Sequence, residues 1–293
     1  MTPRRSRRSV ATAIALIALT IGLSALAAVA DTPSSTVRIA LRNPDESAAE
    51  SAAAIGFEAE LARDLCARMA TSCEIVSGKG DASVAALLAR RADALMAWLP
   101  VTDAQKQAID LSAAYALERH GLVVPVPGPL ADLPGTGKVL SLAATPQDAQ
   151  GAIADLRLHL AGRSVGALAG SADLAFLQSR FEDVTIRAYP AAEALMRDLA
   201  EGRIDAVMGS VAWLQAMLAL PGDRSLAMSG PQFQEDDRFG FGIAVGLRKS
   251  DPALRNMFDR AISQAMSDGT LERLSLKWFK VDLSPHRCFC KPF

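Results

Sequence analysis

Side chains able to do acid–base or metal chemistry are few in this sequence and lie far apart along it. The histidines are His120, His159 and His286. General acid–base catalysis needs titratable groups within hydrogen-bond reach of a reacting atom. The sequence contains no phosphate-binding loop, no spaced set of metal ligands and no nucleophile elbow. We therefore expect no catalytic residue, no metal site and no cofactor.

Two short motifs are suited to holding a polar ligand. Gly170-Ser171 precedes an expected helix over 172–181, where free backbone N–H groups can bind an anion. Thr102-Asp103-Ala104-Gln105 has the spacing of a capping box, in which the first hydroxyl accepts a hydrogen bond from the fourth residue. Both motifs gather polar groups at the start of a helix, which indicates recognition rather than bond making.

Four cysteines form two pairs along the sequence. Cys66 and Cys73 lie at the end of an expected helix and at the entry to a strand. In an oxidising compartment they suit a small-loop disulfide, and two buried free thiols are the alternative. Cys288 and Cys290 lie beside His286, one ligand short of a closed zinc site. We expect residues 284–293 to form a loose or intermolecularly oxidised tail.

The segments that must position these motifs repeat along the chain. One motif, a short turn that leads into an apolar strand, occurs twice, about 110 residues apart. It occurs at residues 91–96 (RADALM) and 202–208 (GRIDAVM). The 293 residues are enough for two lobes. A cleft between lobes is a common place for a small ligand. The repeat therefore predicts two similar α/β lobes.

Apolar periodicity predicts the main elements. Phe57, Leu61, Leu65 and Met69 recur at every fourth position and predict a helix over 57–69, after a polar connection over 43–54. Strands are expected at 36–41, 74–76, 94–99, 121–126, 164–168, 184–188, 206–209 and 241–247. Helices are expected at 82–90, 172–181, 191–201, 210–220, 252–266 and 271–279. This alternation predicts a parallel-rich sheet covered by helices, while 127–160 gives no clear pattern.

The first 30 residues have the pattern of a secretory signal peptide. Arginines at positions 4, 5, 7 and 8 precede an uncharged apolar run from Val10 to Ala27. Ala28-Val29-Ala30 is a small-residue cleavage site, so Asp31 is the expected first mature residue. An uncleaved membrane anchor is the alternative, because the run approaches spanning length. We expect export and cleavage after Ala30.

Charge argues against nucleic acid as a partner. The whole chain has 31 basic and 32 acidic residues, and the first 30 residues hold four arginines and no acid. The mature chain therefore has 27 basic and 32 acidic residues, a net charge of −5. A mildly acidic chain without a basic stripe does not attract phosphate backbones. We expect a soluble mature protein in the periplasm.

An ordered set of motifs resembles a known family. The set is GFEAELARDLC (56–66), RRADALM (90–96), GRSVGALAGS (162–171), GRIDAVM (202–208) and a final block over 239–279 that contains GLRKSD and DGT. It resembles the family 3 extracellular solute-binding proteins, the periplasmic receptors of polar amino-acid ABC importers. The likeness is greatest to lysine/arginine/ornithine, histidine and opine receptors. It runs from Thr36 to Leu283 and implies a disulfide between Cys66 and Cys73.

The resemblance implies the type II periplasmic-binding-protein fold. In that fold two α/β lobes are joined by two crossover strands that form a hinge and close on ligand. Crossings are expected near 123–125 and 240–242, where glycines either serve the hinge or relieve crowding. The expected divisions are a signal peptide (1–30), lobe 1 (36–124 plus 241–283), lobe 2 (125–240) and a tail (284–293). The resemblance also implies a monomer that passes a small-molecule ligand to an ABC permease in the inner membrane.

The pocket expected from the resemblance departs from the family pattern. Family members hold a ligand carboxylate with an arginine and the ammonium with an aspartate, because burying either charge unpaired is costly. Gln105 stands at the arginine position, Ser210 stands at the acid position, and Ala97-Trp98 replaces a Ser-Ser pair. The expected ligand-binding residues are Trp98, Pro100, Thr102, Gln105, Ser171, Asp173 and Ser210.

Several interpretations of this pocket follow. In the first, the ligand is a small polar or amphipathic metabolite other than an ordinary α-amino acid, against an apolar wall of Trp98 and Pro100. Trp98 taken alone could instead be a core residue. In the second, an amino acid still binds, with Lys106 or Arg42 supplying positive charge and Asp173 taking the ammonium. The third is an accessory or regulatory periplasmic protein that no longer serves transport, and the fourth is a dehydratase-like enzyme on the same fold.

Overall fold

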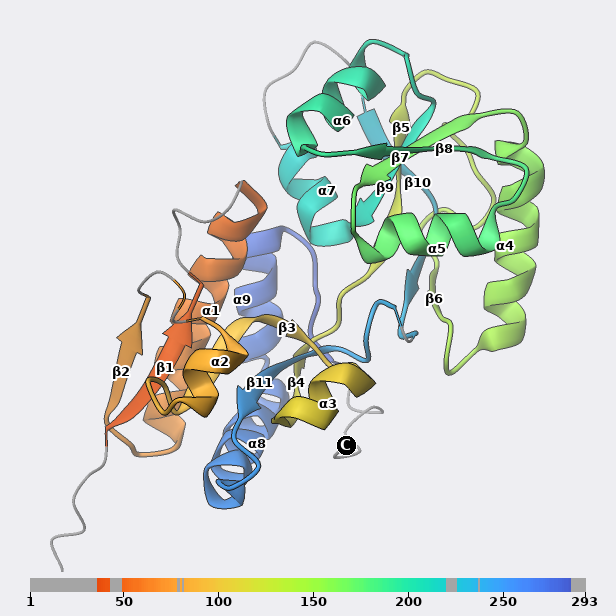
Figure 1. Ribbon diagram of the computed structural model, residues 1–293. Helices are drawn as coiled ribbons and strands as arrows, with labels where there is room; N and C mark the ends of the chain where they lie inside the picture. The colour runs from red at the N-terminus through yellow and green to blue at the C-terminus, as the bar shows by residue number, and fades with distance from the viewer. Residues whose placement is uncertain are drawn as a thin grey trace, which may run out of the picture. The chain divides into compact units, whose positions relative to one another are not determined.

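The structure is a computed structural model that describes residues 36–42, 49–77, 80, 82–219, 226–236 and 238–285. Strands and helices alternate through most of this part of the chain, and the strands form two separate sheets (Figure 1). We call each sheet with its covering helices a lobe. The two-lobed α/β fold expected from the sequence is confirmed. The expected signal peptide and the cysteines of the expected tail lie outside the described residues.

The first lobe has a mixed sheet with the strand order β2-β1-β3-β11-β4. Its strands are β1 (Val37–Leu41), β2 (Cys73–Val76), β3 (Ala94–Pro100), β4 (Asp110–Ala116) and β11 (Ile243–Leu247). β1 is parallel to β2 and β3, whereas β11 is antiparallel to β3 and β4. Its helices are α1 (Ala49–Arg68), α2 (Val84–Leu88), α3 (Asp103–Ala108), α8 (Pro252–Ser267) and α9 (Thr270–Phe279). Elements from early and late in the chain, orange and blue in Figure 1, therefore share this lobe.

The second lobe has the strand order β6-β10-β5-β9-β7-β8. Its strands are β5 (His120–Pro125), β6 (Val139–Ser141), β7 (Ser164–Leu168), β8 (Thr185–Tyr189), β9 (Ala206–Ser210) and β10 (Leu226–Gln234). β7 is parallel to β8 and β9, and β5 is antiparallel to β9 and β10. Its helices are α4 (Pro146–Leu160), α5 (Ala172–Arg180), α6 (Ala192–Ala200) and α7 (Val211–Leu218).

Alternate residues of the strands supply apolar clusters on both faces of each sheet. In β1, Ile39 and Leu41 pack in the cluster that contains buried residues of α1, α8 and α9. Ala40, between them, packs in another cluster with Leu87 of α2. Successive side chains of a strand point to opposite faces, so helices must cover both sides of the sheet. The central strands of the second lobe divide in the same way between two clusters.

Among the described residues, two passages, at 117–119 and at 235–236 with 238–242, lie between the strands of the two sheets. The first passage lies before the expected crossing at 123–125. The difference arises because the apolar run of β5 is a central strand of the second sheet, paired on one side with β9 and on the other with β10. The second passage includes Gly240 and Gly242, whose φ angles are +81° and +110°. Glycine adopts positive φ without the strain that a Cβ would add.

Helix α1 is longer than its apolar periodicity predicts. The expected face is present, since Phe57, Leu61 and Leu65 are buried in the core of the first lobe. However, the helix begins at Ala49, within the segment expected to be a polar connection. Residues 49–54 are mostly alanine with a serine and a glutamate, and alanine has the highest intrinsic helix propensity. Because these small residues show no apolar periodicity, the sequence pattern did not predict the first turns of α1.

Strand β10 was missed in the sequence because it contains a turn signal. Ser229-Gly230-Pro231 lies inside the strand, and Gly230 has a φ of +80°. The pairing with β5 shifts register between Ser229 and Phe233, as at a β-bulge. Bulges tolerate glycine and proline inside a strand because they release ladder hydrogen bonds. Strands β4 and β6 and helix α4 were also not identified, the last two in the segment without a clear pattern.

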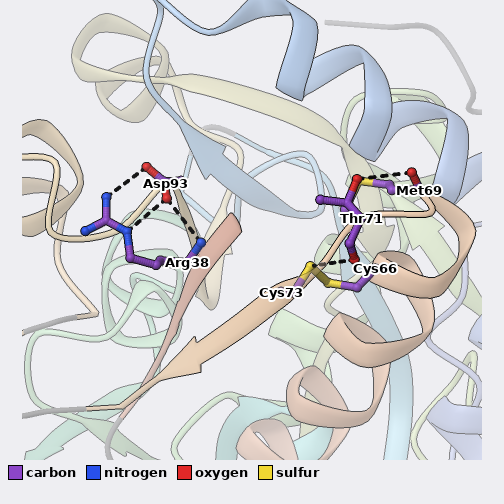
Figure 2. The surroundings of a disulfide bond; sticks show 6 residues. All are labelled: Arg38, Cys66, Met69, Thr71, Cys73 and Asp93. Carbon is purple, nitrogen blue, oxygen red and sulfur yellow. Dashed lines mark hydrogen bonds and ion pairs between the residues drawn. A yellow bond between two sulfur atoms is a disulfide. The ribbon is translucent and has the colours of Figure 1, made fainter. Parts of the chain in front are cut away.

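A disulfide joins Cys66 near the end of α1 to Cys73 at the start of β2 (Figure 2). This confirms the expected pairing over the alternative of two free thiols. Backbone hydrogen bonds hold the turn between the two cysteines. The Thr71 hydroxyl also donates a hydrogen bond to the Met69 carbonyl over 3.1 Å. The bridge therefore fixes the connection from the first helix to the edge strand of the sheet.

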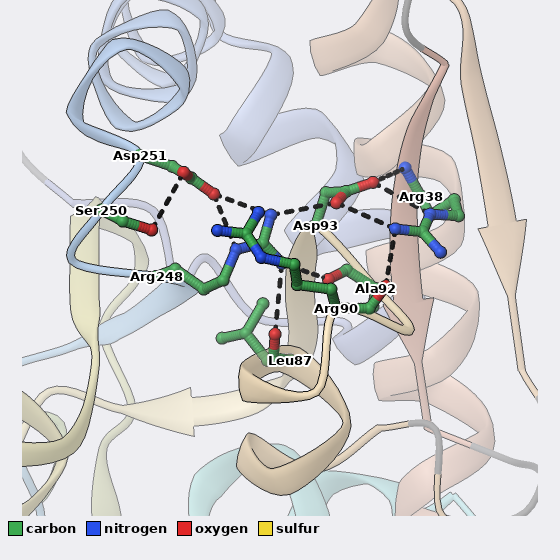
Figure 3. Close-up of polar contacts among 8 residues, drawn as sticks. All are labelled: Arg38, Leu87, Arg90, Ala92, Asp93, Arg248, Ser250 and Asp251. Atoms are coloured by element: carbon green, nitrogen blue, oxygen red, sulfur yellow. Dashed lines mark hydrogen bonds and ion pairs between the residues drawn. The ribbon is translucent and has the colours of Figure 1, made fainter.

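Arg248 connects the two sequence segments that build the first lobe (Figure 3). Its buried guanidinium donates to the carbonyls of Leu87 (3.1 Å) and Ala92 (2.6 Å), and it pairs with Asp93 (3.0 Å) and Asp251 (2.7 Å). Figures 2 and 3 both show Arg38 of β1 on the same Asp93. Burial opposes ionisation of Asp93, but hydrogen bonds from both arginines outweigh it and hold the pKa of this carboxyl below its usual value.

Candidate functional site

Each sheet has one point where the strand order reverses. β1 lies between β2 and β3, and β7 lies between β8 and β9, with all four of these pairs parallel. In open α/β sheets, ligands bind outside the carboxyl ends of the strands at such a switch point. In the first lobe that place is occupied by Arg42 and Ala97, which follow the paired residues Leu41 and Met96. In the second lobe, residues 169–171 follow β7, and β9 ends at Ser210.

Arg42 spans the switch point of the first lobe. Its Nη2 donates to the carbonyl oxygen of Ala97 over 2.8 Å, which ties the end of β1 to β3. The side chain is half-buried. Among the described residues, no carboxylate lies within ion-pair distance of this guanidinium. The end of β1 therefore carries a positive charge that is fixed in place by the neighbouring strand.

Trp98 is held at the edge of the first-lobe core. Its backbone φ is +52°, in the left-handed region that non-glycine residues rarely adopt. The backbone N–H of Trp98 donates a hydrogen bond to Glu58 Oε1 over 2.6 Å. The indole packs edge-on to Phe57, with ring centroids 6.0 Å apart, and lies 5.1 Å from the ring of Phe279. The partly buried indole is thus packed against the core, as in the interpretation that treats it as a core residue.

Glu58 lies beneath Trp98 and is fully buried. The Tyr115 hydroxyl also donates to its Oε1, whereas Oε2 has no hydrogen-bond partner among the described residues. Burial raises the pKa of Glu58, and the hydrogen bonds from Tyr115 and Trp98 offset only part of that rise. Burial and the same carboxyl raise the pKa of Tyr115 well above its usual value. Sequence reasoning missed this group, whose partners are 40 and 57 residues away.

The remaining expected residues of the first lobe lie at the end of β3 and the start of α3. Pro100 ends β3, and Thr102 caps α3 by accepting a hydrogen bond from the Gln105 N–H over 3.3 Å. The capping role of Thr102 is therefore confirmed. Lys106 lies 3.7 Å from Asp103 and 5.8 Å from the ring centre of Phe241. These contacts hold the Lys106 ammonium against its own helix and the second passage.

Ser171 and Ser210 are helix caps in the second lobe. Ser171 accepts a hydrogen bond from the Leu174 N–H over 3.1 Å, after Gly170 with a φ of +76°. Ser210 accepts one from the Trp213 N–H over 3.3 Å. The structure therefore brings the starts of α5 and α7 to the carboxyl ends of β7 and β9, the switch point of this sheet. Exposed N–H groups at helix starts favour negatively charged or polar ligand groups.

Asp173 is paired with His120. Its Oδ1 lies 2.9 Å from His120 Nδ1, and the two side chains are 10% and 6% exposed. His120 stacks on Phe239 with ring centroids 3.8 Å apart, and its backbone lies opposite Ser210 in the sheet. Burial alone would lower the pKa of His120. The charge and hydrogen bond of Asp173, with smaller contributions from Glu118 and Asp236, outweigh burial and raise it.

Sequence reasoning set His120 aside because it matched no pocket position. The strand register brings His120 close to Asp173 and Ser210. This position could have been predicted only from the pairing of β5 with β9. The seven expected ligand-binding residues form two groups on different sheets. Trp98, Pro100, Thr102 and Gln105 belong to the first lobe. Ser171, Asp173 and Ser210 belong to the second.

The described residues contain no group of histidine, cysteine and acidic side chains arranged to hold a metal ion. Nor is any helix in this part of the chain both long and apolar enough to cross a membrane. Polar caps, one fixed arginine and one buried ion pair at two switch points make an arrangement suited to ligand binding.

The pattern of the bacterial extracellular solute-binding proteins, family 3, matches residues 37–281. The chain belongs to this family. The octopine-binding periplasmic protein of Rhizobium meliloti is 36% identical over 250 residues, covering 79% of this chain and 84% of the relative. The histidine-binding periplasmic protein of Salmonella typhimurium is 30% identical over 232 residues, covering 78% and 80%.

Solved structures of family 3 proteins share the fold. The second substrate-binding domain of a putative amino acid ABC transporter from Streptococcus pneumoniae matches with a TM-score of 0.62 at 22% identity, covering 83% of this chain and all of that domain. The second substrate-binding domain of GlnP from Lactococcus lactis, in an open conformation, matches with a TM-score of 0.61 at 16% identity, covering 84% and 96%. The expectation of a family 3 solute-binding protein that serves ABC-type import is thus confirmed at the level of the family.

Proposed function

We propose that this protein captures an amino-acid derivative with a substituted amino group, of the opine type, and delivers it to an ABC permease. The observation that carries the proposal is the pairing of Asp173 with His120. Asp173 is the acid that the sequence offers for a ligand ammonium, and one of its oxygens is already engaged. The octopine-binding relative, at 36% identity, supports the same ligand class.

A free α-ammonium needs an anionic partner when it leaves water. Burying it without one costs several kcal/mol, about the binding free energy of a micromolar ligand. Ser210 offers a hydroxyl at the expected acid position, and it caps α7. Glu58 is fully buried with one oxygen taken by Trp98 and Tyr115. The substituted nitrogen of an opine keeps its positive charge but presents fewer N–H donors. The carboxylate of its carboxyethyl group partners that charge within the ligand, so the protein needs no second acid.

The expected ligand-binding residues take definite roles in this proposal. Trp98 and Pro100 supply an apolar wall, and Gln105 supplies neutral hydrogen bonds on the first lobe. On the second lobe, the helix starts capped by Ser171 and Ser210 present N–H groups to a polar part of the solute. Thr102 shapes the start of α3, and Asp173 positions the start of α5 through its bond to His120.

The proposal includes the partners and the compartment. The protein acts outside the cytoplasm as a monomer after cleavage behind Ala30. It passes its solute unchanged to a permease in the inner membrane and performs no chemistry on it. The relatives that support this compartment are named as periplasmic binding proteins.

A thermal-shift panel on the protein from Asp31 onward tests the ligand class. The panel pairs octopine, an arginine whose amino nitrogen carries a carboxyethyl group, with L-arginine, and adds L-histidine and L-lysine. A ligand at 1,000 times its dissociation constant adds roughly 4 kcal/mol of stability. We expect octopine to give the largest shift. A larger shift with any free amino acid contradicts the proposal, and no shift with any compound supports the accessory interpretation instead.

A further inference from the structure

Arg42 lies where the first sheet reverses its strand order. It directly follows β1, and the register that pairs Leu41 with Met96 places Ala97 beside it on β3. The hydrogen bond from Arg42 Nη2 to the Ala97 carbonyl, 2.8 Å long, holds the guanidinium across the two strands. This is the edge at which ligands of open α/β sheets bind. A charged side chain that is fixed at this edge is placed to contact the ligand.

The charge of Arg42 has no acidic partner among the described residues. Other arginines that are shielded from solvent in the first lobe do have one: Arg68 pairs with Asp64, Arg248 with Asp93, and Arg255 with Asp110. Among the described residues, the Arg42 guanidinium makes one hydrogen bond, to the neutral Ala97 carbonyl, and that bond uses one of its five N–H donors.

Burial raises the pKa of Glu58 and the charge of Arg42 opposes that rise, but the Glu58 carboxyl is already hydrogen-bonded to Trp98 and Tyr115. Arg42 acts on the pKa of Glu58 only as a weaker influence, after burial and the hydrogen bonds from Tyr115 and Trp98. Burial disfavours the charged form of Glu58, which limits its value as a counter-ion. Among the described residues at the first-lobe switch point, the positive charge of Arg42 is therefore not cancelled by Glu58.

We propose that Arg42 is the anchor for a carboxylate of the solute, so that the ligand is an organic acid whose anionic group lies at the ends of β1 and β3. The inference rests on the proposed function, since it names the chemistry of the same binding site. Arginine suits this role because its planar guanidinium matches a carboxylate with two parallel hydrogen bonds. Gln105 of α3 is neutral, so the carboxylate is recognised from the strand edge instead.

The anchor is tested by titration calorimetry with three probes: octopine, L-arginine and L-argininamide, in which the carboxylate is replaced by a neutral amide. Arg42→Gln should weaken binding of the tighter acid about 100-fold, and Arg42→Lys about 10-fold, because lysine keeps the charge and loses the paired geometry. The wild-type protein should bind L-arginine at least about 10-fold more tightly than L-argininamide. Arg63→Gln, at an exposed arginine of α1, is the matched control and should bind as the wild type does.

The variants also separate this anchor from the other cation considered in the sequence. Lys106→Gln should leave acid binding within about 3-fold of the wild type. Circular dichroism and the thermal midpoint of each variant establish that it folds, and the argininamide comparison needs no variant at all. Equal binding of L-arginine and L-argininamide, or unchanged acid binding in Arg42→Gln, overturns the anchor. A loss in Lys106→Gln alone assigns the carboxylate to that residue and also overturns it.

The two proposals fail in different ways. If L-arginine binds more tightly than octopine but binding is lost in Arg42→Gln, the ligand class is wrong and the anchor stands. If octopine binds tightly and Arg42→Gln changes nothing, the ligand class stands and the anchor is wrong. If neither acid binds the wild-type protein, both proposals are contradicted.

Discussion

His120 and Asp173 form a buried ion pair whose strength depends on pH. The pKa of His120 is raised, since the negative charges of Asp173, Glu118 and Asp236 outweigh the effect of burial. A histidine with a raised folded pKa stabilises the protein most when the pH is below its unfolded pKa of about 6.5. That contribution is lost as the pH rises through the higher folded pKa.

We therefore expect the difference in unfolding free energy between the wild type and His120→Gln to shrink from about pH 6 to about pH 9. Urea unfolding of both proteins at several pH values measures it. His159→Gln is the control, because His159 is exposed and, among the described residues, its ring bonds to a carbonyl of its own helix. A difference that stays constant or grows with pH contradicts this account of the pair.

At the scale of single residues, local contacts could be predicted and distant ones could not. The cap formed by Thr102 and the helix start at Ser171 follow from spacings of three residues, and both occur in the structure. The partners of Arg42, Glu58 and His120 lie 40 to 57 residues away along the chain. Such contacts depend on strand order and register, which no local pattern encodes.

At the scale of elements, Arg248 is the residue that joins the early and late segments of the first lobe. Its guanidinium satisfies two carbonyls and two aspartates that come from two parts of the chain, residues 87–93 and Asp251. Removing a buried partner from such a network leaves uncompensated polar groups, at a cost of about 3–5 kcal/mol. Arg248→Ala should therefore lower the unfolding free energy by about that amount in urea.

The neighbouring Lys249 provides the control for this network. It is exposed and donates to the Gln107 carbonyl, so Lys249→Ala should change stability by no more than about 0.5 kcal/mol. A loss below about 1 kcal/mol in Arg248→Ala would show that the network contributes little and that apolar packing holds the lobe together.

Elements with strong apolar periodicity were the ones that the sequence predicted well. Strand β7 has its expected bounds, and α5 differs by one residue at its end. The elements that were missed, β4, β6, β10 and α4, are short, rich in small residues or interrupted by turn signals. The existence of the three strands depends on pairing with strands from elsewhere, as β10 pairs with β5 and β6. Tertiary context overrides local preference in such segments.

At the scale of the whole molecule, the sequence predicted the class of fold because its repeated motif marks the starts of two equivalent strands. Residues 91–96 lead into β3 and residues 202–208 lead into β9, and both strands adjoin a switch point. The position of the first passage was misjudged by a few residues, because a buried apolar strand gives no sign of which sheet it joins.

Export of the whole molecule gives a prediction that is independent of the ligand. When the full chain is produced in a bacterial host, the periplasmic protein should begin at Asp31, because the arginine-rich start, the apolar run and Ala28-Val29-Ala30 direct cleavage there. Intact mass and N-terminal sequencing of the periplasmic fraction measure this. A periplasm-facing protein that keeps Val10–Ala27 would establish the membrane-anchor alternative.

The central claim is that the solute is an N-substituted amino-acid derivative rather than a free amino acid. Native mass spectrometry of the protein from Asp31 onward, mixed with equal concentrations of octopine and L-arginine, tests it most directly, since both compounds compete for one site. The account predicts that the complex with octopine is the main species whenever the ligands together exceed the protein, so that binding sites are limiting. A main species with L-arginine would contradict it.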